Sequence, residues 1–166
     1  MVIKLESYSL ASDVLERQFG PCTLKVLQQN ESTRFISVQN SHGDILELAR
    51  TDFILPSTHE FTDVHNAIMG GKSMGKAFRD ADIKFTRDLK LVEHRPLPDQ
   101  LRKHFSQDGF ATVMLLDIYV GTQNIHYAQI LEVYSPRVHW RQHTQHRNIG
   151  ASDQKLADHL LQSFPS

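Results

Sequence analysis

Residues 111–134 read ATVMLLDIYVGTQNIHYAQILEVY, a pattern typical of two apolar β-strands joined by a turn. The two runs, 111–120 and 125–134, are rich in aliphatic and aromatic residues, which favour strands. The four residues between them, Gly121 to Asn124, include two common turn formers. Because so short a connection joins antiparallel neighbours, the stretch predicts an antiparallel sheet.

The rest of the chain alternates strand patterns with helix signals. A hairpin loop is predicted at 40–44. Ser57 and Glu60 have the spacing of a helix capping box, and the helical pattern after them stops at Gly70 and Gly71. Short turns between strands indicate an α+β fold, with a central antiparallel sheet of about six strands and helices on one face. The other predicted strands are 24–28, 34–39, 45–55 and 83–91; the predicted helices are 12–19, 57–69, 73–78 and 153–161, the last capped by Ser152; and a loop with a short helix at 100–105 is predicted for 93–108.

The composition fits one ordinary globular domain. The chain has 166 residues, 40% of them hydrophobic, and a formal net charge of −1. We therefore expect a single domain over residues 1–166, with a polar C-terminal tail from about residue 137. Near-neutral charge favours neither nucleic acid nor an anionic membrane surface as a partner. No apolar run is long enough to span a bilayer, the N-terminus lacks a signal-peptide pattern, and Cys22 is the only cysteine, so a cytoplasmic location is the simplest expectation.

Arg34 is the first candidate for a functional residue. Strand alternation puts Arg34, Ile36 and Val38 on one face, and the two apolar neighbours indicate that this face points inward. A buried guanidinium needs an anionic partner, because an unpaired buried charge is costly. The spacing alone favours a structural ion pair with a protein carboxylate. The alternative is a ligand carboxylate, which the planar fork of arginine also binds well.

Glu132 is the second candidate. It shares a strand face with Ile130 and Tyr134, where a core residue would be expected. Burial without a cation would raise the pKa of this carboxyl group and would suit proton transfer or hydrogen bonding to a hydroxyl group. The alternative is a structural glutamate that pairs with a nearby arginine or lysine.

The glycine-bracketed segment at 70–75 is the third candidate. It resembles a phosphate loop only partly, because Asn66 stands where that motif requires a glycine and a helix, not a strand, precedes it. A helix is predicted to begin near Ser73, and the N–H groups at a helix start attract anions. The alternative is that the glycines serve only the turn.

We predict no metal site and no cofactor. His139, His143 and His146 have helical spacing, but they lack an accompanying acidic cluster, so a solvated polar segment is the simpler interpretation. The chain also lacks the glycine-rich dinucleotide fingerprint and the nucleophile elbow of serine hydrolases.

Taken in order along the chain, these segments resemble the chorismate pyruvate-lyase family, which has the chorismate lyase/UTRA-like fold. Arg34 stands at the start of a strand, as the family's carboxylate-binding arginine does. The stretch 71–76, with Thr86-Arg87-Asp88 after it, looks like the family's Gly-Lys-Thr-Pro-Leu-Gly-Arg and Thr-Arg-Asp stretch. Residues 131–136 look like its terminal strand, in which a glutamate precedes a proline. The similarity runs from about residue 12 to residue 136, interrupted by an apparent insertion at 96–107.

The resemblance implies a lyase that converts chorismate to 4-hydroxybenzoate and pyruvate without a cofactor. In that interpretation Arg34 and Glu132 are the catalytic residues. Arg34 would hold the ring carboxylate, helped by the backbone N–H groups of Met74 and Gly75. Glu132 would hydrogen-bond the ring hydroxyl group and assist proton transfer, and Val14 would contact the substrate.

The same fold also serves as an effector-binding domain in some transcription regulators. The alternative function is therefore a non-catalytic domain that binds a small aromatic acid. The chain has too few residues before Ser12 for the DNA-reading module that such a regulator normally carries, so we expect the enzyme from the sequence.

Overall fold

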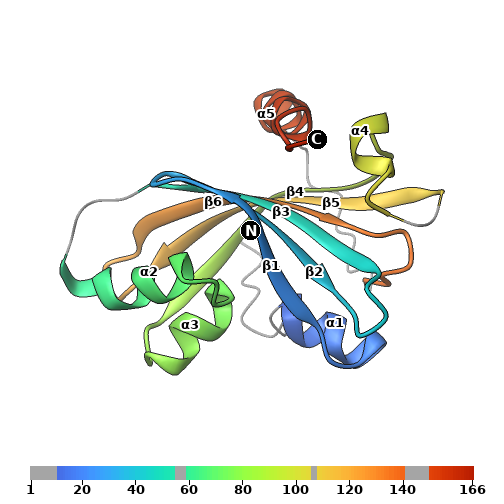
Figure 1. Cartoon of the computed structure of the whole chain (residues 1–166). Coiled ribbons are helices and arrows are strands. Elements are labelled where there is room, and N and C mark those ends of the chain that lie inside the picture. The colour runs from blue at the N-terminus through green and yellow to red at the C-terminus, as the bar shows by residue number, and fades with distance from the viewer. Residues whose placement is uncertain (1–10, 55–58, 106–107, 141–149) are drawn as a thin grey trace.

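The computed structural model describes residues 11–54, 59–105, 108–140 and 150–166. Within these residues the strands form a six-stranded, fully antiparallel sheet in the order β1-β2-β3-β6-β5-β4 (Figure 1). The predicted α+β class and strand number are thus confirmed. The strands are β1 (Thr23–Gln29), β2 (Thr33–Gln39), β3 (Ile45–Phe53), β4 (Phe85–Pro96), β5 (Phe110–Val120) and β6 (Ile125–Tyr134).

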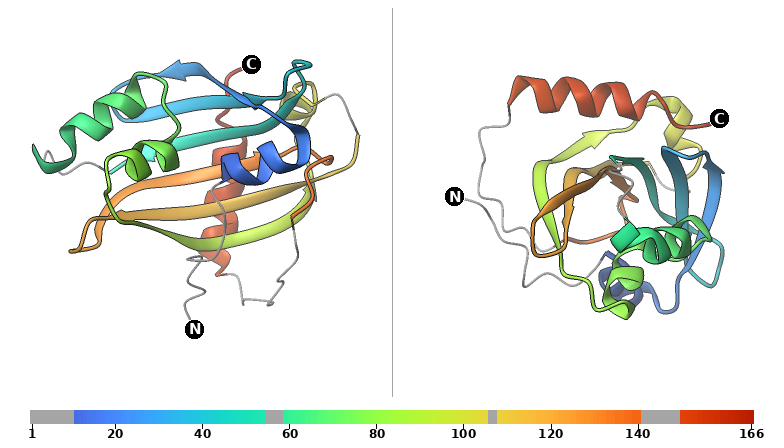
Figure 2. Two further views of the ribbon diagram at one scale, coloured as in Figure 1. Left: turned by 90° about the horizontal axis from the view of Figure 1, so that it is seen from below. Right: turned by 90° about the vertical axis from the view of Figure 1, so that its left-hand side faces the viewer.

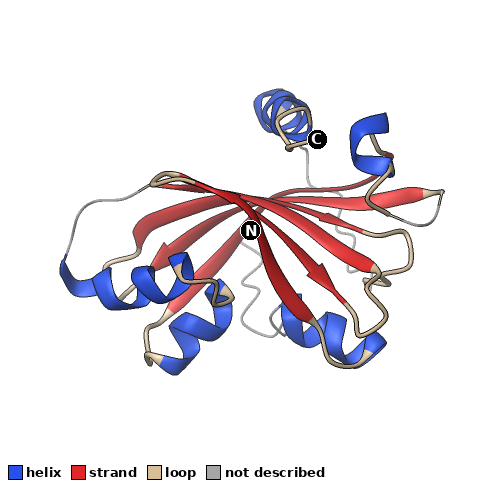
Figure 3. Cartoon of the chain, viewed as in Figure 1, coloured by secondary structure: helices blue, strands red, loops and turns tan. Residues whose placement is uncertain are grey.

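Helices lie on both faces of this sheet. As expected, α1 (Ala11–Phe19), α2 (Thr62–Met69) and α3 (Met74–Asp80) gather on one face, with the short 3-10 helix His59–Phe61 leading into α2 (Figures 1 and 2). Two further helices, α4 (Asp99–Arg102) and α5 (Ala151–Leu161), lie over the opposite face (Figure 3). The sheet is therefore the middle layer of the molecule.

The β5–β6 hairpin lies near the centre of the sheet and matches its prediction closely. Gly121 and Asn124 in the turn have φ angles of +74° and +50°, in the left-handed region that glycine and asparagine tolerate best. Most of β5 is buried without alternation. Such a continuous apolar run is what a strand needs when both faces of its sheet are covered.

Some boundaries differ from those predicted. β4 continues through Pro96, where we expected a loop from residue 93. Because β4 is an edge strand, a proline at its end costs no ladder hydrogen bond inside the sheet. Gly150, rather than Ser152, precedes the first turn of α5. The predicted capping box at Ser57 and Glu60 lies partly outside the described residues, whereas the predicted stop of α2 at Gly70 is found.

Two hydrophobic clusters fill the spaces between the layers. The first contains Ile36, Ala49 and Ile130 and lies under α1–α3. The second contains Leu131 and Val133 and lies under α4 and α5. The tail after residue 137 is therefore not only polar, and the described part of the segment at 96–107 packs in the second cluster. That part, α5 and the residues after α5 bury Leu97, Leu101, Phe105, Ala157, Leu160, Leu161 and Phe164 there.

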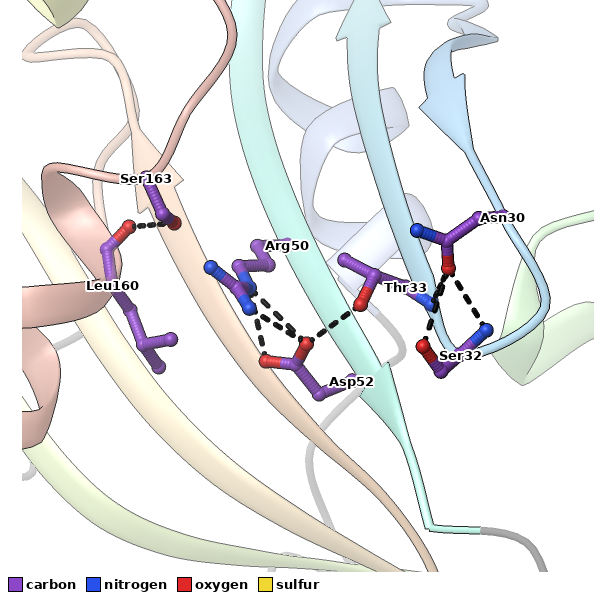
Figure 4. A network of polar contacts seen from close by, with 7 residues as sticks. All are labelled: Asn30, Ser32, Thr33, Arg50, Asp52, Leu160 and Ser163. Carbon is purple, nitrogen blue, oxygen red and sulfur yellow. Dashed lines mark hydrogen bonds and ion pairs between the residues drawn. The ribbon is translucent and has the colours of Figure 1, made fainter.

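A polar network fixes β2 against β3 at one end of the sheet (Figure 4). In the β1–β2 turn, Asn30 Oδ1 accepts hydrogen bonds from the N–H groups of Ser32 and Thr33 at 2.9 and 2.8 Å. The Thr33 hydroxyl group donates to Asp52 at 3.0 Å, and Asp52 is paired with Arg50 at 2.9 Å. These contacts hold the start of β2, the strand segment that carries the predicted ligand-binding arginine.

We predict that replacing Leu161 by alanine destabilises the protein by about 2–5 kcal/mol, because this side chain at the end of α5 is fully buried against the sheet. Urea unfolding would measure the change. The matched control is Lys155→Ala on the exposed side of the same helix, which should stay within about 0.5 kcal/mol of the wild type. Equal stability of the two variants would mean that α5 is not part of the folded core.

Candidate functional site

The register of the sheet brings the predicted site residues together. On the face covered by α1–α3, side chains of β2, β3 and β6 stand in rows across the strands. Neighbouring rows are two residues apart along a strand, which is roughly 6.5 Å. Arg34 and Glu132 therefore stand in adjacent rows, two strands apart. The rows are Arg34–Thr51–Ile130, Ile36–Ala49–Glu132 and Val38–Glu47–Tyr134.

A cavity of about 90 Å³ opens between these rows and the helices. One water molecule needs roughly 10–15 Å³ of such space, so the cavity has room for about one substituted six-membered ring. Arg34, Glu132, Met74 and Gly75, which the sequence singled out, all line it. Val14 is buried in α1 but does not line the cavity. The first two residues of that helix, Ala11 and Ser12, line it instead.

Within the described residues, the Arg34 side chain is held by backbone carbonyl groups and not by a carboxylate. Its exposed fraction is 2%. Nη1 donates to the carbonyl oxygens of Ile68 and Lys72 at 2.7 and 3.2 Å, at the end of α2 and in the loop after it. No described residue accepts a hydrogen bond from Nε. Burial lowers the pKa of Arg34, and the nearby Tyr127 and Glu47 only partly oppose this.

Two carbonyl groups orient the guanidinium but leave its charge uncompensated. The structural ion pair that the spacing of Arg34 favoured is absent from the described part of the chain. A buried cation with a free donor is costly by itself. The cavity wall therefore contains a buried cation that has no anionic partner among the described residues.

Glu132, in contrast, already has a cation. Arg87 Nη2 donates to both of its carboxylate oxygens at 2.7 Å, and the Tyr134 hydroxyl group donates to Oε2 at 2.7 Å. Burial by itself lowers the pKa of Arg87, but the Glu132 carboxylate, helped by Tyr134 and Glu47, reverses this and raises the pKa above its ordinary value. The paired alternative for Glu132 is therefore found, and it places a fixed carboxylate in the wall of the cavity.

Two residues of the site were missed in the sequence. In the sequence Arg87 was considered only as part of a family motif, and its ion pair with Glu132 was not predicted. Glu47 was not noticed, although it lines the cavity with an exposed fraction of 5%. The signal for Glu47 was available, since it stands in the apolar strand pattern of Leu46 and Leu48 just as Glu132 does in its own strand.

The Glu47 carboxyl group has no bonded partner in the described part of the chain, since no hydrogen bond or ion pair reaches it. Burial raises its pKa to about 8, and repulsion from Glu132 adds to this, while Arg87 and Arg34 oppose it. Glu47 is thus largely protonated at neutral pH.

Two ion pairs tie α1 to α3 beside the cavity. Lys76 Nζ lies 3.2 Å from Glu16 Oε1, and Arg79 Nη2 lies 2.9 Å from Asp13 Oδ2. Both helices lie on the same face of the sheet, as the left view of Figure 2 shows. These ion pairs are half-exposed and contribute little stability, but they join the two helices that flank the opening.

Within the described ranges, no three histidine, cysteine or acidic side chains are grouped as metal ligands would be. Of the three histidines considered in the sequence, His143 and His146 lie outside these ranges. None of the described helices combines the length and the apolar character needed to cross a membrane.

A scan against protein-family models finds no match, and a search of the curated proteins finds no relative. Among solved structures, the chain is similar to YydK, a possible transcriptional regulator from Bacillus subtilis. The TM-score is 0.54 and the sequence identity 10%, over 82% of this chain and 66% of that protein. The chain thus spans about two thirds of the length of YydK.

Two further structures are more distant. The C-terminal domain of the histidine utilization repressor from Pseudomonas syringae has a TM-score of 0.47 and 8% identity, over 76% of this chain and 100% of that domain. The C-terminal domain of Yurk from Bacillus subtilis has a TM-score of 0.36 and 11% identity, over 68% of this chain and 86% of that domain. At the identity found for YydK the likeness shows the fold alone. That fold is the chorismate lyase-like α+β arrangement predicted from the sequence.

We predict that Glu47→Gln stabilises the protein at pH 8 by roughly 1–3 kcal/mol. An unfolded glutamate titrates near 4.5 and Glu47 in the folded protein near 8. The protonated form therefore contributes stability below pH 4.5 that is lost as the pH rises to 8. Glutamine cannot ionise and avoids this loss.

Urea unfolding at pH 5 and pH 8 would measure the effect. The exposed Glu31→Gln is the matched control and should show no difference between the two pH values. A Glu47→Gln variant whose advantage over the wild type does not grow between pH 5 and pH 8 would contradict the prediction.

Proposed function

We propose that this chain binds a small ring-shaped carboxylic acid in the cavity and acts as an effector-sensing domain. The observation that carries the proposal is Arg34. Its guanidinium is buried, is oriented by two backbone carbonyl groups, and belongs to a side chain that lines the cavity, while its Nε has no acceptor among the described residues. A ligand carboxylate would supply both the missing charge and the missing acceptor.

The rest of the wall supports a ring as the body of the ligand. Aliphatic and aromatic side chains from all six strands, α1 and α3 surround the space between Arg34 and Glu132. Apolar walls with a few fixed polar groups are the usual composition of a small-molecule site. The apolar lining consists of Ala11, Leu24, Ile36, Val38, Ala49, Met74, Phe85, Ile118 and Ile130.

The fold also supports a sensing role. YydK, a possible transcriptional regulator, shares the arrangement of this chain, and a domain that only reports the presence of its ligand needs a fixed site but no reactive group. The pairing of Glu132 with Arg87 and Tyr134 fits this role, because it commits that carboxylate to structure.

We predict that Arg34→Met abolishes binding of 4-hydroxybenzoate and of chorismate, with a loss of at least 100-fold in affinity, because the charge-assisted hydrogen bonds are removed. Isothermal titration calorimetry would measure it. Arg50→Met is the matched control, since Arg50 stacks over Phe35 on the opposite face of the sheet. Circular dichroism would check that both variants fold, and an unchanged affinity in Arg34→Met would refute the proposed site.

A second candidate function is that of a chorismate pyruvate-lyase. The specific observation in its favour is the pair of buried carboxyl groups, Glu47 and Glu132, in the cavity wall. In this reaction the ether C–O bond breaks, the ring loses one proton as it becomes aromatic, and the departing enolpyruvate takes up one proton to become pyruvate. Glu47, which is protonated at neutral pH, and Glu132 could exchange these protons without a cofactor.

If the lyase function holds, incubation with chorismate releases pyruvate and 4-hydroxybenzoate in equal amounts. Glu132→Gln should then slow turnover by about 100-fold or more while product binding remains. A coupled pyruvate assay and the absorbance of the aromatic product would measure both. Binding of chorismate without release of pyruvate would remove the lyase candidate and leave the sensing role.

A further inference from the structure

Glu47 and Arg34 stand at opposite ends of the cavity. Arg34 is in the first of the three rows on the covered face, and Glu47 is in the third. Four residues along a strand separate these rows, which is roughly 13 Å between backbone positions. A ring carboxylate held by Arg34 would therefore direct its far substituent towards Glu47.

None of the described neighbours of Glu47 forms a hydrogen bond or an ion pair with its carboxyl group. Arg87 Nη2 spans both oxygens of Glu132, and the Tyr134 hydroxyl group also donates to Glu132. Tyr134 is the residue paired with Glu47 across the strands, so its donor is directed to the adjacent row. The carboxyl group of Glu47 is thus left to interact with whatever occupies the cavity.

The charges around the cavity decide the protonation state of Glu47 when a ligand is bound. Arg34 and Arg87 bring two positive charges to the cavity wall, and Glu132 brings one negative charge. A ligand carboxylate at Arg34 completes neutrality, so an ionised Glu47 would add an uncompensated negative charge in a space with little water. Such a charge is costly, and protonation removes it.

We propose that Glu47 is a specificity-determining residue: it enters the complex as a neutral carboxyl group, donates a hydrogen bond to an acceptor oxygen at the far end of a ring carboxylate, and so couples ligand binding to proton uptake. This inference rests on the proposed binding function of the cavity. It narrows the ligand class to ring carboxylic acids with an oxygen substituent on the side of the ring away from the carboxylate.

The other titratable groups around Glu47 do not explain proton uptake on ligand binding. Burial raises the pKa of Tyr134 well above its ordinary value, and the pKa of Arg87 is raised as well, so both keep their protons. Glu132 is held by Arg87. Arg34 remains charged in this pH range. Cys22, just before β1, has a pKa raised by burial and then by Glu16 and Glu47, and it is the group to control for.

The test uses two probes of nearly equal shape, 4-methoxybenzoate and 4-ethylbenzoate. Only the first carries an oxygen that can accept a hydrogen bond, and neither substituent titrates. We expect the wild type to prefer the methoxy probe by about tenfold. Glu47→Leu should lose this preference. Glu47→Gln should keep most of it, because the amide group still donates.

Proton uptake is measured by calorimetry in two buffers of different ionisation enthalpy. We expect the wild type to take up about half a proton per methoxy probe at pH 8, given a pKa of about 8 for free Glu47. Uptake should fall towards zero at pH 6. Glu47→Gln should show no uptake at either pH, and Cys22→Ala should behave as the wild type does.

The outcomes separate the two proposals. If neither benzoate binds the wild type, the proposed function and this inference both fail. If both bind in an Arg34-dependent manner, but without proton uptake and without preference for the methoxy probe, the function stands and the role of Glu47 is refuted. Tighter binding of 4-(aminomethyl)benzoate than of the methoxy probe would also refute it, because an ammonium group would require an ionised Glu47.

Discussion

The uncompensated charge of Arg34 is the constraint around which this site is organised. A guanidinium in the middle of an apolar face is tolerated only because α2 and the loop after it turn their last carbonyl groups towards it. The chain thus holds the cation in place without neutralising it. A buried cation without a counter-ion attracts an anion more strongly than a surface arginine does, because water does not screen the interaction.

The sheet supplies the second requirement, which is a dry and rigid wall. Its two faces belong to separate clusters, and each of the strands β2 to β6 contributes residues to both. Because α5 and α4 close one face and α1–α3 the other, water is kept away from the backbone beneath the site. The two acids in the wall then experience different surroundings, since Glu132 is paired with Arg87 while Glu47 forms no ion pair with any described cation.

The sequence was informative about strands and about which side chains face inward. The alternation around Arg34 and around Glu132 predicted that each side chain faces inward, whereas their shared site was implied by the family resemblance. The β5–β6 hairpin was predicted from its apolar runs and its turn. Partners were harder to predict, because Arg87 and Glu132 are distant in the chain and meet only through the strand order. That order also decides that Glu132, and not Glu47, takes the available arginine. Helix ends were harder to predict, because they depend on backbone geometry as well as on residue type. The start of α5, for example, was predicted at Ser152 but follows Gly150.

Side chains of β6 point alternately to the two faces of the sheet, so the short turn that sets the register of β6 also decides which of them face the cavity. Glu132 faces the cavity, whereas its neighbours Leu131 and Val133 face α5. A slip of one residue in the pairing of β5 with β6 would exchange their places, leaving an aliphatic group beside Arg87 and an unpaired acid beneath α5. The length of the Gly121–Asn124 turn opposes that slip. The turn does not line the cavity, yet its length helps to decide which side chains of β6 do.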